Sequence, residues 1–147
     1  FRNLLNYHEM GSIIKAKVIE HDSEYSISTL SFPGGQLRIP KTEAAVGKIV
    51  SVRIRARDVS LSVIRPKKVS QLNVLEGKIN KIDDQRVSVN HNLNHETDIC
   101  IDIGLPLWAR ITRLSINKLK LKEGQKVYAL IKSTSIDRES IGKKFAE

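Results

Sequence analysis

Two copies of one strand-rich pattern follow each other along this chain of 147 residues, and the duplication limits what the chain can fold into. The matching stretches keep the same order in both copies, although few residues are identical. They are 16–19 with 77–80, Gly34 and Leu37 with Gly104 and Leu107, and 47–56 with 124–133. A duplicated unit of roughly 60–70 residues predicts two small barrels in tandem, because closing a sheet into a barrel removes its exposed edges.

Alternation of apolar and polar residues indicates strands throughout both copies. The segments Pro33-Gly34-Gly35 and Gly104-Leu105-Pro106 supply turn residues between them. The predicted strands are 13–21, 24–32, 37–40, 48–56 and 60–64 in the first copy, and 75–82, 86–91, 98–103, 107–112 and 127–133 in the second. The chain is therefore predicted to be all-β.

The second copy is longer than the first at one place. Gly47 lies 13 positions after Gly34, whereas Gly124 lies 20 positions after Gly104. The extra residues fall within 110–122, where Ser115 is predicted to be the N-cap of a short helix. The unpaired N–H groups at a helix start suit an anion, but a plain capped helix that closes one end of the barrel is the simpler interpretation.

Composition limits the classes of function. The chain has 25 Lys and Arg against 16 Asp and Glu, and this net charge of +9 favours anionic partners. The pair Gly47-Lys48 is followed by Ile49 where a phosphate-binding loop needs Ser or Thr, so ATP binding by this chain alone is not predicted. No local motif suggests a catalytic triad or dyad, and we predict no catalytic residue and no enzyme activity. The one cysteine, Cys100, excludes an internal disulfide.

Two histidines, His91 and His95, have a spacing that zinc uses on helices. Their segment is rich in Asn and lies between two strand-like runs, which favours a polar hairpin loop. Structural zinc also normally requires four protein ligands. We therefore predict neither a metal site nor a cofactor in this chain.

Three arginines, Arg53, Arg55 and Arg57, share one face of a predicted strand. Like charges in such a ladder repel one another unless an anion lies between them. Nucleic acid is one candidate, because small barrels often bind it by stacking bases on aromatic side chains. Aromatic residues make up only 5% of the chain and are scattered, so nucleic acid ranks below a small oxyanion.

A second set of polar residues gathers at three predicted chain ends: the start of the second copy, the helix start and the end of the last long strand. Where such ends meet at one end of a barrel, hydroxyls, N–H groups and one ammonium would surround a tetrahedral oxyanion. Hydrogen bonds to an ion are about twice as strong as neutral ones. The candidate oxyanion-binding residues are Ser70, Asn73, Thr112, Ser115, Lys132 and Ser133. Surface hydroxyls without a ligand are the alternative that the sequence leaves open.

Four longer stretches resemble the ATP-binding subunit of molybdate ABC transporters. They are KVIEHD at 17–22, VRIRARDVSL at 52–61, WARITR at 108–113 and LKEGQKVYALIKS at 121–133. The last of them is similar to the end of the molybdate-binding Mop (TOBE-type) domain of that family. The stretches occur in the family's order, and the resemblance covers residues 11–137.

The resemblance implies two tandem small OB-like β-barrels with short helices, of the Mop/TOBE type. It divides the chain into a trailing connection from an upstream nucleotide-binding domain (1–10), a first barrel (11–65), a linker (66–69), a second, Mop-type barrel (70–137) and a polar C-terminal tail (138–147). In the family the Mop unit binds molybdate or tungstate between subunits and regulates transport. The expected partners are a second copy of the chain, the nucleotide-binding domain and the membrane permease, with no nucleic acid. The expected location is the cytoplasmic, inner face of the cell membrane.

The family's binding motifs carry over with one departure. The Ser-x-Arg-Asn pattern that opens the Mop unit reads Ser70-Gln71-Leu72-Asn73, so Leu72 stands where an Arg is common. The Thr-x-x-Ser element stands at 112–115 and the Lys-Ser element at 132–133. The resemblance implies that Ser70, Ser115 and Ser133 donate hydrogen bonds, that Lys132 supplies charge, and that Thr112 and Asn73 brace the loops.

The first copy departs further from this pattern. It keeps Arg55 in the place of Lys132, but it has Glu9 and Ser12 near the places of Ser70 and Asn73. No equivalent complete site is expected there. Two other readings stay open for the whole chain: a purely structural dimerisation domain, which Leu72 favours, and a basic OB-like module that binds nucleic acid.

Overall fold

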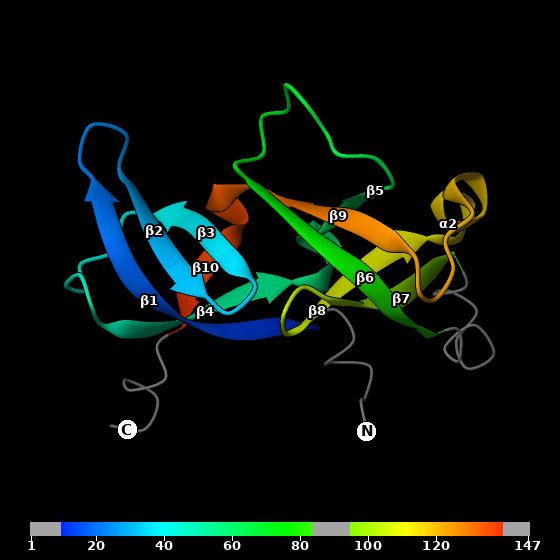
Figure 1. Cartoon of the computed structure of the whole chain (residues 1–147), viewed down its shortest axis with the longest axis horizontal. Helices are drawn as coiled ribbons and strands as arrows, with labels where there is room; N and C mark the ends of the chain where they lie inside the picture. Colours follow the sequence, from blue (N-terminus) through cyan, green and yellow to red (C-terminus); the bar gives the residue numbers. More distant parts are fainter. Residues whose placement is uncertain (1–9, 84–94, 140–147) are drawn as a thin grey trace.

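The computed structural model describes residues 10–83 and 95–139, which form two five-stranded antiparallel sheets, each curled into a small barrel (Figure 1). The strand order is β10-β4-β1-β2-β3 in the first sheet and β5-β9-β6-β7-β8 in the second. The strands are β1 (Gly11–Asp22), β2 (Ile27–Phe32), β3 (Gly35–Pro40), β4 (Ile49–Arg55), β5 (Ser60–Ser62), β6 (Asn73–Asp83), β7 (Glu96–Asp102), β8 (Pro106–Thr112), β9 (Lys126–Ile131) and β10 (Ile136–Glu139). The predicted fold class, two OB-like barrels with short helices, is confirmed.

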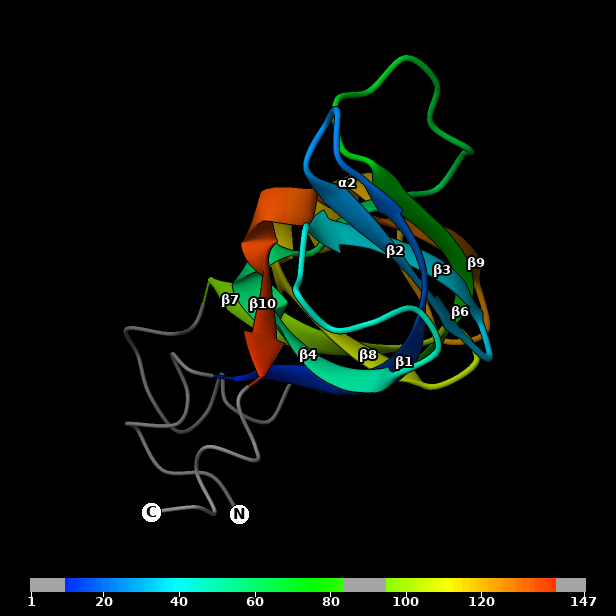
Figure 2. The same cartoon turned by 90° about the vertical axis from the view of Figure 1, so that its left-hand side faces the viewer.

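The two copies exchange their last strands. After β4 the chain makes a 3₁₀ turn, η1 (Ala56–Asp58), and β5 then pairs with β9 of the second sheet. After β9 it makes the matching turn η4 (Ser133–Ser135), and β10 pairs with β4 of the first sheet. Figure 2 looks along the molecule from the side of the first barrel, where β10 lies beside β4. Each barrel therefore contains one strand from the other copy. The predicted division into two barrels joined by a linker at 66–69 does not include this exchange.

Several element boundaries differ from the predicted ones. β2 begins at Ile27 rather than at Glu24, because residues 23–26 form a turn in which Ser26 has φ 55° and the Tyr25 N–H is bonded to Asp22. β5 ends at Ser62. The predicted strand 86–91, with His91, lies outside the described residues.

The helix in the longer copy is α2 (Arg113–Leu119), and its N-cap is Thr112 rather than the predicted Ser115. Thr112 has extended backbone angles, and its side-chain oxygen accepts a hydrogen bond from the Ser115 N–H at 3.1 Å. Both residues are good N-caps by type, so the sequence alone does not distinguish them. The helix ends at Lys120, which adopts the left-handed conformation, before Gly124 is reached.

β-Bulges at matching positions show which residues of the two copies correspond. β1 has a bulge between Val18 and Glu20, and β6 has one between Ile79 and Lys81. The N–H of Gly47 donates to the carbonyl of Val18 at 2.7 Å, and that of Gly124 donates to Ile79 at the same distance. Residues at equal distances from the bulges, such as Ser12 and Asn73, are therefore structural equivalents.

One continuous apolar core runs through both barrels. The alternation along β1 buries Ile14, Ala16 and Val18 while Lys15 and Lys17 face solvent. The inward-facing residues of β7, β8 and β9 continue the same cluster. Among the described residues, no helix is long and apolar enough to cross a membrane.

Candidate oxyanion-binding site

The structure divides the six predicted binding residues into two groups. Asn73 pairs with Ile131, so the start of β6 lies beside the end of β9 and brings Leu72 and Asn73 next to Lys132 and Ser133. Ser70 precedes the first paired residue, Asn73, by three positions. Thr112 and Ser115 lie instead at the end of β8 and the start of α2, where they line a depression together with Arg57 and Ser60. Ser70 and Lys132 do not line that depression. A single chain therefore holds the predicted residues in two separate groups.

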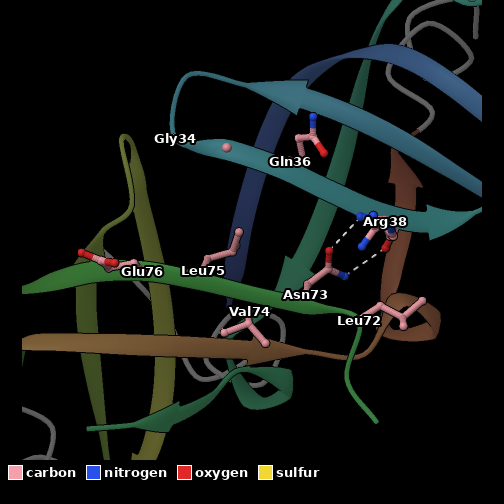
Figure 3. Close-up of a pocket in the computed structure, with 9 residues that line it drawn as sticks. Gly34, Gln36, Arg38, Leu72, Asn73, Val74, Leu75 and Glu76 are labelled. Carbon is pink, nitrogen blue, oxygen red and sulfur yellow. Dashed lines mark hydrogen bonds between the residues drawn. The ribbon is translucent and has the colours of Figure 1, made fainter. Parts of the chain in front are cut away.

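Asn73 anchors the first group. Its side chain is buried between the barrels, where Oδ1 accepts from the Arg38 N–H at 2.7 Å and Nδ2 donates to the Arg38 carbonyl at 2.9 Å (Figure 3). Ser12, its equivalent in the first copy, makes one such bond, accepting from the Trp108 N–H at 3.0 Å. Asn73 therefore joins the second barrel to β3 of the first.

A depression opens beside Asn73, between β3 and β6. Leu72, which is 46% exposed, lies at one end of it. Its lining residues include Gly34, Gln36, Arg38, Val74 and Glu76. The Glu76 carboxylate is paired with Arg65 at 3.0 Å and lies 3.9 Å from the Lys126 ammonium. Arg38 is not among the residues predicted from the sequence, because only the packing of the two barrels brings it to the start of β6.

Lys132 and Arg55 are equivalent residues with different surroundings. Each immediately precedes a 3₁₀ turn. The Arg55 guanidinium forms an ion pair at 2.9 Å with Asp137, which follows the other copy's turn. Ser60 has the place of Asp137 in the second barrel, and the exposed Lys132 ammonium forms no ion pair within the described part of the chain. The cation in the second copy is therefore open to an anion, whereas its equivalent in the first copy is neutralised.

The side chains of Thr112 and Ser115 are joined by a hydrogen bond between their hydroxyls. Thr112 accepts from the Ser115 N–H, and its own hydroxyl donates to Ser115 Oγ at 3.0 Å. The hydroxyl proton of Ser115 remains available for a third group. Arg110 lines the same depression, but its guanidinium is bound to the buried Asp98 at 2.9 Å.

Cys100 lies apart from both groups. Burial raises the pKa of its thiol, and the neighbouring Asp102 carboxylate raises that pKa further. The thiol therefore stays protonated at neutral pH, and a protonated thiol is a poor nucleophile.

Residues 69–137 match the TOBE domain family. Together with the two OB-like barrels, this match gives the class that the chain resembles: a tandem barrel of the Mop/TOBE type, whose second copy is similar to TOBE domains.

Relatives of this chain carry the description "Molybdenum import ATP-binding protein ModC". The relative from Paramagnetospirillum magneticum is 37% identical over 141 residues, which is 95% of this chain and 37% of that protein. The relative from Mesorhizobium japonicum is 34% identical over 135 residues, 91% of this chain and 35% of that protein. The chain therefore spans about a third of the length of the relatives that it matches.

A solved structure has the same fold. A crystal structure of the cytoplasmic molybdate-binding protein ModG, with molybdate bound, superposes with a TM-score of 0.68 over 85% of this chain and 92% of that chain. The two sequences are 20% identical, so this likeness concerns the fold alone.

Proposed function

We propose that this chain is the regulatory part of a molybdate import ATP-binding subunit, and that it binds molybdate or tungstate. The open Lys132 ammonium, beside Ser133 and the start of β6, is the observation that carries the proposal. The names of the relatives and the fold of ModG support molybdate as the ligand. Dianionic oxyanions favour a site that combines one free cation with several hydroxyl and N–H donors.

The site is completed by a second copy of the chain. Ser70, Lys132 and Ser133 of one protomer supply charge and donors, and Ser115 of its partner supplies a further hydroxyl that Thr112 orients. The division of these residues over two surfaces of one chain supports this arrangement. A ligand held between protomers stabilises the dimer that contacts it.

Coupling to transport follows from the same arrangement. The nucleotide-binding domain and the permease change conformation during transport, and an oxyanion shifts that equilibrium only by its difference in affinity for the two states. Such coupling free energies are typically about 1–3 kcal/mol. The proposed location is the cytoplasmic face of the membrane, with the other transporter subunits as partners.

Calorimetric titration with molybdate tests this function. Saturable heat is expected with the wild-type chain, and Lys132→Ala should remove most of it. Lys15→Ala removes an equal charge from the exposed face of β1 and should leave the binding unchanged. An absence of saturable heat at millimolar molybdate would contradict the proposal, as would equal binding by the Lys132 and Lys15 variants.

A second function is favoured by Leu72, which removes a cation from the family's pattern. In that case the barrels only hold two ATP-binding subunits together. The dissociation constant of the dimer, measured by analytical ultracentrifugation with and without molybdate, distinguishes the two functions. A constant that molybdate leaves unchanged supports the purely structural role.

A further inference from the structure

We propose that Arg38, from the first copy, supplies to the oxyanion site of the second copy the positive charge that Leu72 does not. This inference rests on the proposed oxyanion binding. It adds a specificity-determining residue that lies outside the TOBE-domain match, since that match begins at residue 69.

The placement of Arg38 follows from its backbone. Both of its backbone polar groups are bound by the buried side chain of Asn73, at 2.7 and 2.9 Å. These two bonds fix the Cα of Arg38 beside the start of β6, one residue from Leu72. Figure 3 shows Asn73 reaching from β6 to Arg38 on β3, with Leu72 next to it at the end of the strand. Asn73 therefore acts as a positioning residue for Arg38.

The other members of the first group converge on the same place. Because Asn73 pairs with Ile131 in an antiparallel ladder, the next position outward sets Leu72 opposite Lys132. β3, which carries Arg38, also packs against the turn η4, which begins at Ser133. Arg38, Lys132 and Ser133 thus lie around Leu72, on three segments that are held together by strand pairing and packing.

The charge of Arg38 is available to a ligand. Its side chain is exposed and forms no ion pair within the described residues. The one acidic residue lining the same depression, Glu76, is paired with Arg65 and approached by Lys126. A guanidinium presents two parallel N–H donors, which match two oxygens of a tetrahedral oxyanion.

The first copy has no counterpart of this arrangement. Trp108 holds the place of Arg38, four residues after the equivalent glycine, and Asp137 neutralises the equivalent cation Arg55. Of the two cations that lie around Leu72, the equivalent junction thus lacks one and has the other neutralised, although Arg57 of η1 is exposed nearby. This asymmetry is expected when a single junction binds the anion.

The test compares molybdate affinities by calorimetry. Arg38→Gln should weaken binding about tenfold or more, because a charge-assisted hydrogen bond is lost. The backbone contacts with Asn73 do not depend on the Arg38 side chain, so the variant should keep the thermal stability of the wild type. Lys15→Gln, with the same loss of net charge, should stay within twofold of the wild type, and Arg38→Lys should lose less than Arg38→Gln.

The variant Leu72→Arg provides a second measurement. It places an Arg where the family has one. The double variant Leu72→Arg/Arg38→Gln should therefore recover most of the molybdate affinity that Arg38→Gln loses. Arg38→Gln should also reduce the affinity less in the Leu72→Arg protein than in the wild type. If Arg38→Gln and Lys15→Gln bind molybdate equally, Arg38 has no role, although the oxyanion site itself stands. If the wild-type chain binds no molybdate, both the proposed function and this inference fail.

Discussion

Gly34 and Gly104, which hold the same position in the two copies, lie against each other where the barrels meet. A Cβ built on Gly104 would come within 2.6 Å of the Gly34 Cα, and one built on Gly34 would lie 1.5 Å from the carbonyl oxygen of Ile103. Backbone atoms surround both positions, so a side chain has no room to turn away. The close approach of the two barrels therefore depends on the absence of a Cβ at these two residues.

Two glycine substitutions should distinguish the cost of a steric clash at this junction from the cost of backbone strain. Gly34→Ala introduces the clash and should lower the free energy of unfolding by roughly 3 kcal/mol or more. Gly47→Ala is the matched control, since Gly47 has φ 96° but nothing within 4 Å of the added Cβ. It should cost only the left-handed strain, about 1–2 kcal/mol. Urea unfolding measures both values, and equal losses would contradict the close junction.

Asn73→Ala should destabilise the contact between the barrels. It removes two hydrogen bonds and leaves the backbone groups of Arg38 without these partners, for a loss of roughly 2 kcal/mol. Ser12→Ala, at the equivalent position, removes the single bond to Trp108 and should cost about half as much. Chemical denaturation compares the two variants, and a larger loss at Ser12 would show that the Asn73 bonds contribute little.

The ion pair between Arg110 and Asp98 is buried, so breaking it should cost more stability than breaking an exposed ion pair. The two side chains are 4% and 0% exposed, so Asp98→Ala leaves a buried charge without its main partner and should cost about 3–5 kcal/mol. Asp137→Ala breaks the exposed pair with Arg55, whose side chains are 53% and 34% exposed, and should cost at most about 1 kcal/mol. Thermal melts of the two variants give the comparison. Similar melting temperatures would mean that Asp98 is not a stabilising partner.

Features that depend on local sequence pattern could be predicted from the sequence, whereas features that depend on tertiary pairing could not. The alternation along β1 and the order of the glycines sufficed for two barrels, because period-two burial is a local property. The pairing of β5 with β9, and of β10 with β4, is not local, since a strand's pattern shows its buried face but not its neighbour. The same limit applies to the site. The hydroxyl-bearing residues could be named from the sequence, but Arg38 and Leu72 come close together only when the two barrels pack.

The strand exchange predicts how one copy behaves when it is separated from the other. The polypeptide 66–139 keeps β6 to β10 but lacks β5, so one edge of β9 has no partner, and β10 lacks β4. Because β10 and β5 hold equivalent places after equivalent turns, β10 of one molecule fits the β9 edge of another. The polypeptide should therefore form a dimer by exchange of β10.

Light scattering after size-exclusion chromatography measures the mass of this species. Ile136 is buried at the start of β10, so Ile136→Asp should abolish the dimer, whereas Asp137→Asn, on the exposed face of the same strand, should leave it intact. A folded monomer with the circular dichroism of the full chain would contradict the prediction, because it would show that the second barrel closes without a strand from another copy.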